Sequence, residues 1–182
     1  SIGIGPGLGT DARGKQILEK IFDEYNRPII LDADALNLIS NYSQLLSHVP
    51  VESVITPHPK EFERLFGTTM NDFERIERAK EEAKKWKIVI VLKGHHTCII
   101  NESSCYINFT GNVGMAKGGS GDVLTGILTA LLAQGYPSME AALLGVFLHG
   151  RAADLALEHS AFESMLASDI ISHLAPAFRS LY

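Results

Sequence analysis

The 182-residue sequence has few cysteines, no long apolar segment and no run of basic residues. Cys98 and Cys105 could form a disulfide, but two thiols in a chain of this size favour reduced residues in a cytosolic protein. No stretch approaches the roughly 20 apolar residues that cross a bilayer, and no signal peptide begins the chain. A net charge of −5 without a Lys/Arg cluster argues against partners held by charge. We therefore expect a cytoplasmic protein with no nucleic-acid or membrane partner.

Metal-binding spacings are also missing. None of the seven histidines repeats a zinc-ligand spacing with Cys or His partners, so we expect no structural zinc and assign no metal ligands. His149 falls inside a predicted long helix, near Gly145 and Gly150. Small neighbours favour close helix packing, which predicts a packed, hydrogen-bonded histidine at this position.

The sequence does contain a regular alternation of short apolar runs and segments of helical period, with Gly or Pro at most junctions. The predicted strands span residues 1–4, 28–31, 51–55, 88–92, 97–100 and 105–108, of which the last two form a hairpin. We expect Thr10 to cap the first helix and Asp72 to cap a helix over 72–85. The other predicted helices cover a short stretch after residue 32, then 60–66, 122–133, 138–158 and 168–180. Residues 1–182 therefore predict one α/β domain, a three-layer α/β/α sandwich around a mostly parallel sheet.

The glycine-dense segment 112–126 is the most informative part of the chain. Its glycines let the backbone approach a ligand, and the free amides and positive dipole end of the following helix favour negative charge. Asp122 at this junction would repel a phosphate, so it is either a helix cap or a base acting on a nearby hydroxyl. The density of glycines exceeds what a cap requires and favours the base. Walker A does not fit, because Ser120 stands where its lysine belongs.

Five polar loops follow predicted strands or the hairpin, and ligands of parallel sheets bind beyond the carboxyl ends of the strands. The loops are 5–10, 32–37, 56–61, 93–97 and 118–122. We expect them to converge on one crevice. Plainer explanations stay open for several residues: Asp34 and Asn37 could end a strand and cap a helix, and Glu61 could simply respond to a helix dipole.

The motifs in these loops occur in a specific order. They are Gly5-Pro-Gly-Leu-Gly9, Leu31-Asp-Ala-Asp-Ala-Leu-Asn37, Thr56-Pro-His-Pro-x-Glu61, Leu92-Lys-Gly94 with Thr97, and Lys117-Gly-Gly-Ser-Gly-Asp122. The ordered set resembles the ADP/ATP-dependent NAD(P)HX dehydratases of the ribokinase-like superfamily, and the resemblance covers essentially the whole chain. Gly-Ser-Gly-Asp alone indicates only the superfamily, which also contains sugar and vitamin kinases.

The resemblance implies repair of hydrated NADH and NADPH. The S epimer would be dehydrated by ADP- or ATP-dependent phosphorylation of the ring hydroxyl and elimination of phosphate. Asp122 would take the proton from that hydroxyl, and the amides of Gly119, Ser120 and Gly121 would stabilise the transferring phosphoryl group. The nucleotide would be bound by Lys93, Gly94, His95, His96, Thr97 and Gly121. The hydrated dinucleotide would contact Gly7, Gly9, Asp34, Asn37, His58 and Asp122.

The resemblance also implies cofactors and partners. Mg²⁺ is expected on the nucleotide phosphates, because the sequence shows no dedicated carboxylate cage. A homo-oligomer, and fusion to or pairing with an NAD(P)HX epimerase, are compatible with the resemblance. His95-His96 replaces the small residue pair usual between Gly94 and Thr97, so the choice between ADP and ATP stays open.

Members of this family normally begin with further strands and helices before the loop 5–10, whereas this chain starts inside a predicted strand. We therefore expect Ser1 to follow an artificial boundary, a cleavage or a truncated reading frame, and the amino-terminal part of the domain to be missing. The isolated 182 residues should then be impaired in catalysis. Two alternatives stay open: a small-molecule kinase for a sugar or vitamin precursor, and a non-catalytic nucleotide-binding fragment.

Overall fold

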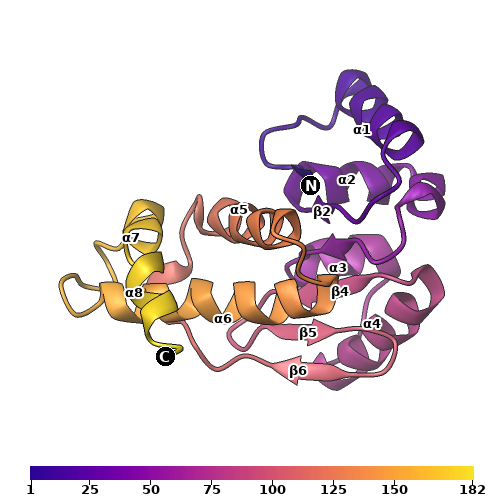
Figure 1. Ribbon diagram of the computed structural model, residues 1–182. Coiled ribbons are helices and arrows are strands. Elements are labelled where there is room, and N and C mark those ends of the chain that lie inside the picture. Colours follow the sequence, from indigo (N-terminus) through magenta and orange to yellow (C-terminus); the bar gives the residue numbers. More distant parts are fainter.

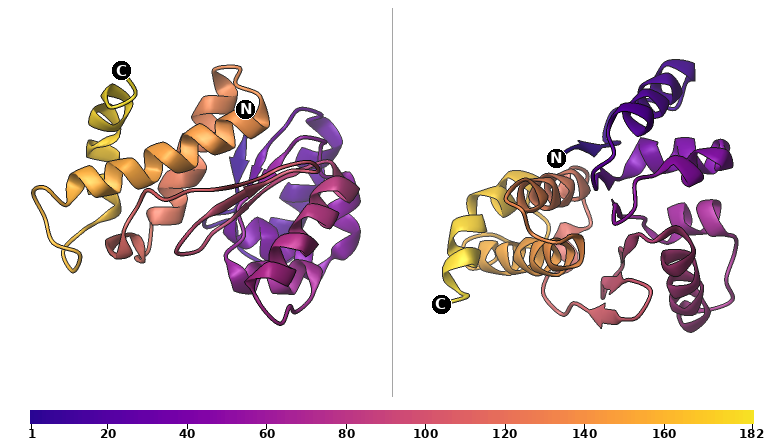
Figure 2. Two further views of the ribbon diagram at one scale, coloured as in Figure 1. Left: turned by 90° about the horizontal axis from the view of Figure 1, so that it is seen from below. Right: turned by 45° about the vertical axis from the view of Figure 1, so that its right-hand side comes forward.

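The computed structural model describes residues 1–182 and has helices on both faces of one six-stranded sheet (Figures 1 and 2). The strands lie side by side in chain order: β1 (Gly3–Ile4), β2 (Ile30–Leu31), β3 (Val54–Ile55), β4 (Val89–Leu92), β5 (Cys98–Ile100) and β6 (Cys105–Ile107). Strands β1 to β4 are parallel, and β5 and β6 add an antiparallel hairpin at one edge. The predicted three-layer α/β fold with its mostly parallel sheet is confirmed.

The helices form two layers, which the right-hand view of Figure 2 separates. One layer contains α1 (Ala12–Glu24), α2 (Ala33–Asn41), α3 (Pro59–Phe66) and α4 (Asp72–Trp86), and the other contains α5 (Ser120–Ala133) and α6 (Ser138–Ala156). Two short helices, α7 (Ala167–Ser172) and α8 (Leu174–Arg179), pack against α6. The chain also forms 3-10 turns at Ser43–His48 and Val113–Met115. No helix combines the length and the apolar character needed to cross a membrane.

Successive strand residues face opposite helix layers. Leu31 and Ile55 pack in the cluster formed with α1 to α4, whereas Ile30 and Val54 pack in the cluster formed with α5 and α6. All four side chains are buried. Because helices cover both faces of the sheet, its central strands are apolar at every position rather than alternating, as in other parallel sheets.

Two predicted helix caps are wrong by one residue. Asp11, not Thr10, caps α1 and accepts hydrogen bonds from the amides of Arg13 and Gly14. Asn71, not Asp72, caps α4. In both places two residues of capping type are adjacent, and the side chain used is the one whose oxygen reaches the amide three residues on.

The predicted terminal helix over 168–180 is instead two helices, which meet at His173. Pro176 explains the break, because its ring conflicts with the carbonyl four residues earlier, at Ser172, where α7 ends. Both cysteines are free thiols. Burial, with a smaller contribution from the neighbouring Cys105 thiol, raises the pKa of Cys98 to about 11, so this thiol stays protonated at neutral pH.

Candidate functional site

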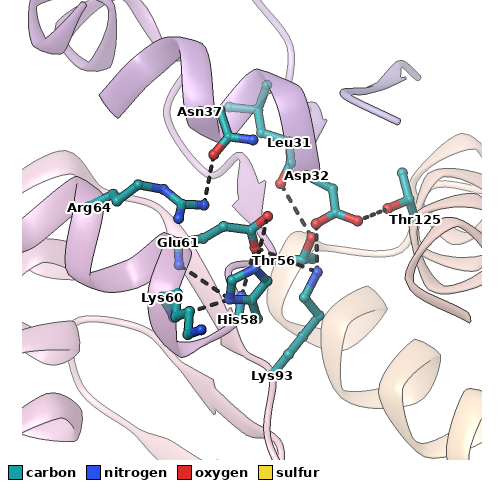
Figure 3. A network of polar contacts seen from close by, with 10 residues as sticks. All are labelled: Leu31, Asp32, Asn37, Thr56, His58, Lys60, Glu61, Arg64, Lys93 and Thr125. Atoms are coloured by element: carbon teal, nitrogen blue, oxygen red, sulfur yellow. Dashed lines mark hydrogen bonds and ion pairs between the residues drawn. The ribbon is translucent and has the colours of Figure 1, made fainter. Parts of the chain in front are cut away.

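Asp32 is the centre of a buried polar network at the carboxyl end of the sheet (Figure 3). It directly follows β2, and its side chain is almost completely buried, with the residue 2% exposed. Asp32 Oδ1 lies 2.7 Å from Lys93 Nζ, and Oδ2 accepts a 3.0 Å hydrogen bond from Thr125 Oγ1 on α5. A single carboxylate therefore connects the loops that follow β2 and β4 to the first turns of α5.

A second carboxylate, Glu61, lies on the other side of Lys93, with Oε2 3.9 Å from Lys93 Nζ. Glu61 is buried and accepts a 2.8 Å hydrogen bond from the His58 amide. His58 Nδ1 in turn accepts hydrogen bonds from the Lys60 and Glu61 amides, which completes a capping box at the start of α3. The ring of His58 thus fixes the helix that holds Glu61, and its contact with the substrate stays a prediction.

The loop that follows β1 crosses directly over Asp32. A Cβ built on Gly5 would lie 1.7 Å from the Asp32 carbonyl oxygen, and Gly5 has a φ of +138°, so only glycine permits this approach. The Gly9 amide donates a 2.9 Å hydrogen bond to Asp34 Oδ2, which ties the far end of the loop to α2. Asp34 therefore holds the loop, whereas Gly7 is exposed on it.

Asn37, the other predicted substrate contact on α2, accepts a 2.8 Å hydrogen bond from Arg64 Nη2 on α3. Its side-chain oxygen is thus engaged with a neighbouring helix, at the point where Ser40 also bonds to the Arg64 carbonyl. These contacts join α2 to α3 (Figure 3). Contact of Asn37 and Asp34 with substrate stays a prediction, and their hydrogen bonds show a role in positioning the loops.

Helix α5 begins without any side-chain cap. Gly119 precedes it in the left-handed region, with a φ of +89°, and the first α-helical bond runs from Val123 N to Gly119 O. The amides of Gly121 and Asp122 have no backbone acceptor, while the Ser120 amide makes a long 3.4 Å bond to Lys117 O. Free amides at a helix start, next to the positive end of its dipole, form an anion site.

Lys93 lies beside this anion site. A Cβ built on Gly121 would be 3.7 Å from Lys93 Nζ and 3.6 Å from Asp32 Oδ2. The ammonium group held by Asp32 and Glu61 therefore borders the free amides at the start of α5. Amides and an ammonium group together favour a phosphate at this position.

Asp122 is exposed in the first turn of α5 and makes no capping hydrogen bond. Asp122 lines an open hollow of about 660 Å³ that lies between α5 and the first eight residues of the chain, including Gly5, Pro6 and Leu8. A second, mostly apolar hollow of about 470 Å³ runs from Asp122 between α5 and the two short helices α7 and α8. Asp122 therefore lies at the border between the anion site and a space large enough for a ligand.

The turn after Lys93 carries exposed aromatic rings. His95 and His96 pack edge to face with ring centroids 4.3 Å apart, and His96 lies 5.0 Å from the ring of Phe109, which is exposed. Thr97 Oγ1 closes the turn through a 3.5 Å contact with the Gly94 carbonyl. These rings offer a stacking surface of the kind that accepts a planar base.

The structure thus brings together residues from all five predicted loops. Asp32, Glu61 and Thr125 were not predicted from the sequence to be members of the site. Asp32 carried a usable signal, because it is the first residue beyond a buried strand. Thr125 carried a weaker one, one turn after Asp122. No group of three or more His, Cys, Asp or Glu side chains is arranged to hold a metal ion.

Known proteins resemble this chain in sequence and in fold. The sequence model of the family described as NAD(P)H-hydrate dehydratase matches residues 1–176. The bifunctional NAD(P)H-hydrate repair enzyme Nnr of Moorella thermoacetica is 40% identical over 99% of this chain and 34% of its own length. The ADP-dependent (S)-NAD(P)H-hydrate dehydratase of Neisseria meningitidis is 39% identical over 98% of this chain and 61% of its own.

A solved structure is similar as well. The ADP/ATP-dependent NAD(P)H-hydrate dehydratase from Bacillus subtilis, co-crystallised with ATP/Mg²⁺, superposes with a TM-score of 0.84 at 33% sequence identity. The similarity covers 98% of this chain and 64% of that one. The chain therefore spans about a third of the bifunctional relatives and about 60% of the dehydratases.

Proposed function

Because the chain belongs to the NAD(P)H-hydrate dehydratase family, we propose that it carries the nucleotide site and the catalytic base of an ADP/ATP-dependent dehydratase. One observation supports this most directly. Asp122 is free of capping bonds and lies between the anion site at the start of α5 and the cavity under the loop after β1. A base in that place can reach a hydroxyl in the cavity next to a phosphate on the helix.

In this reaction, the hydrated nicotinamide ring of the S epimer occupies the cavity, with its hydroxyl near the Asp122 carboxylate. Asp122 takes the hydroxyl proton while the oxygen attacks the terminal phosphoryl group of the nucleotide. An O–P bond forms, and the bond to the bridging oxygen breaks, which releases AMP from ADP or ADP from ATP. The ring nitrogen lone pair then expels phosphate by breaking the C–O bond. Loss of a proton from the adjacent ring carbon restores the double bond of NADH or NADPH.

Lys93 and the amides of Gly119 and Gly121 stabilise the charge on the transferring phosphoryl group. Lys93 is held for this role by Asp32 at 2.7 Å, with Glu61 at 3.9 Å. The Ser120 amide contributes less, since it already donates to the Lys117 carbonyl. The turn from Gly94 to Thr97 binds the rest of the nucleotide, and the histidine rings on this turn stack on its base.

Magnesium enters this scheme bound to the nucleotide phosphates. The side chains of the site do not form a ligand set for a bare ion, and the role assigned to each residue above does not depend on the ion. The relative from Bacillus subtilis was crystallised with ATP/Mg²⁺. Several relatives are bifunctional repair enzymes, so an epimerase, fused or separate, is the proposed partner.

The test supplies hydrated NADPH with ADP or ATP and follows both free phosphate and the absorbance of the reduced nicotinamide. We expect both signals to appear together, and Asp122→Asn to lower the rate by about 10²- to 10⁴-fold, the usual contribution of a general base. Asp23→Asn, an exposed carboxylate on α1, is the matched control and should leave the rate unchanged. An Asp122→Asn variant as fast as the parent would exclude Asp122 as the base.

The same assay separates the alternatives. A small-molecule kinase of this fold would accumulate a stable phosphoester with no recovery of NADPH absorbance. A non-catalytic binder would bind ADP, yet release no phosphate from either nucleotide. Comparing ADP with ATP at equal concentration decides the nucleotide preference.

A further inference from the structure

His149 on α6 makes a buried contact with the first residue of α5. His149 Nε2 lies 3.3 Å from Ser120 Oγ, and both residues are only 7% exposed. Ser120 stands between Gly119 and Gly121, whose amides belong to the proposed phosphate site. The reaction described above gives His149 no role, so a buried polar side chain touches the middle of the site without an assigned purpose.

Neighbouring turns of α6 also hold the segment that leads into α5. The Gly111 amide and Asn112 Nδ2 donate to the two oxygens of Asp154, at 2.9 and 3.0 Å. Thr110 Oγ1 donates to the Phe147 carbonyl at 3.0 Å. Helix α6 therefore fixes the start of this segment through Asp154 and its end through His149.

The contact is made by an uncharged ring. Burial lowers the pKa of His149 to about 4; a hydrogen bond to the Ser120 backbone opposes this shift, and the Lys93 charge adds to it. At neutral pH His149 is therefore a neutral hydrogen-bonding group. Such a group can orient Ser120 without adding a second full charge beside Lys93.

We propose that His149 is a positioning residue for phosphoryl transfer: through Ser120 it fixes the first turn of α5, so that the Gly119 and Gly121 amides point at the transferring group. This role rests on the proposed function of the α5 start. A misplacement of these donors by about 1 Å would cost up to roughly 100-fold in rate, because their stabilisation depends on preorganisation.

The test compares His149→Leu, Ser120→Ala and the double variant. We expect each single change to lower kcat by about 10- to 100-fold while KM for the nucleotide stays within about threefold, since aligned donors matter most in the transition state. If both residues act through one contact, the double variant loses no more than the worse single variant. Full additivity of the two losses would overturn the proposal, as would a His149→Leu variant with parental kcat.

His149→Gln covers the case in which leucine unfolds the protein. Glutamine keeps a hydrogen-bonding group at this place, so it should recover at least part of the lost kcat; a folded His149→Gln variant no better than His149→Leu would contradict the role. His48→Leu, an exposed histidine on the 3-10 turn, is the matched control and should behave as the parent.

Nitrogen-15 NMR separates this inference from the proposed function, because it needs no turnover. In the parent, the His149 imidazole should be neutral at pH 7, and Ser120→Ala should move its Nε2 resonance. Adding ADP should shift the Gly119 and Gly121 amide signals in the parent and clearly less in His149→Leu. A parent that binds ADP with these shifts but releases no phosphate would defeat the proposed reaction alone. An Nε2 resonance indifferent to Ser120→Ala would defeat the role of His149 alone.

Discussion

Three of the four helices in one layer start with a side-chain cap, the exception being α2, where Asp32 makes no capping hydrogen bond. In the layer of α1 to α4, Asp11, His58 and Asn71 each fold back as a side-chain cap and satisfy the amides of α1, α3 and α4. Helix α5 in the other layer follows Gly119 and leaves the amides of Gly121 and Asp122 without an acceptor. A capped start uses its hydrogen-bonding capacity inside the fold, whereas the open start of α5 keeps it for a ligand.

The charged residues show the same contrast. Lys20 and Glu24 on α1 form a loose 3.9 Å pair in solvent, with side chains 72% and 69% exposed. Lys93 and Asp32 form a 2.7 Å pair with Asp32 buried, next to the open end of α5. The surface pair can be lost at little cost, while the buried pair maintains the site.

Breaking the buried pair should have the largest effect on stability. Lys93→Met leaves the Asp32 carboxylate buried with only Thr125 as a side-chain partner, which we expect to lower the free energy of unfolding by on the order of 3 to 4 kcal/mol. Lys20→Met, the exposed control, should change it by less than about 0.5 kcal/mol. Urea unfolding measures both values. Equal stability of the two lysine variants would show that the buried Lys93–Asp32 pair stabilises the fold no more than the exposed Lys20–Glu24 pair.

Acid should lower the free energy of unfolding through His149 on α6. The folded-state pKa of about 4 lies below the ordinary histidine pKa of 6.5, so the unfolded chain binds a proton first and stability falls as pH drops from 6.5 to 4. The expected loss is roughly 3 kcal/mol, from 1.36 kcal/mol per pKa unit. Denaturant titrations at several pH values should show this slope in the parent and a flatter one in His149→Gln. Parallel slopes would contradict the buried, neutral state of His149.

Adding a side chain at the uncapped start of α5 should weaken ligand binding and leave the stability of the fold unchanged. In Gly121→Ala the new methyl would meet Asp32 and Lys93 at ordinary contact distances of 3.6 and 3.7 Å, and alanine favours a helix. The methyl would however occupy space that a phosphate needs, so we expect about tenfold weaker ADP binding, near 1.4 kcal/mol. Calorimetry measures the affinity of the variant for ADP, and thermal unfolding measures its stability. Unchanged ADP affinity would place the phosphate elsewhere.

Removing a helix cap should lower stability slightly and leave ADP binding unchanged, which is the smallest effect expected. Asn71→Ala takes away the 2.9 Å hydrogen bond to the Glu74 amide at the start of α4, which we expect to lower the free energy of unfolding by about 1 kcal/mol. ADP affinity should stay at the parental value. A change in ADP binding would mean that the start of α4 is coupled to the site.

Local residue patterns, taken segment by segment along the chain, were enough to predict the fold. Apolar runs that alternate with segments of helical period indicated a sheet between two helix layers, and polar loops after the strands indicated one crevice. The predicted caps Thr10 and Asp72 were wrong, because the neighbouring residue in each place is equally suited to capping. Which of two adjacent residues caps a helix depends on the local backbone conformation, which the sequence does not reveal.

The buried network could not be predicted, because its contacts join residues far apart in the chain. Asp32 and Lys93 are 61 positions apart, and Asp32 and Thr125 are 93 apart. Asp34 and Asn37 were predicted from the sequence to contact the substrate, and that contact stays a prediction. Their bonds to Gly9 and Arg64, however, emerge only once the loops are packed. For Asp122, the sequence favoured a base over a helix cap, and the missing capping bond supports that hypothesis.

The close approach of Gly5 to the Asp32 carbonyl has a practical consequence for protein engineering. Backbone contact at Gly5 fixes the start of this loop, the Asp34 carboxylate holds its end at the Gly9 amide, and Leu8 packs against the core. Pro6, which is exposed beside the hollow, can therefore be varied in a library, while residue 5 must be kept as glycine and Leu8 as an apolar residue in every clone.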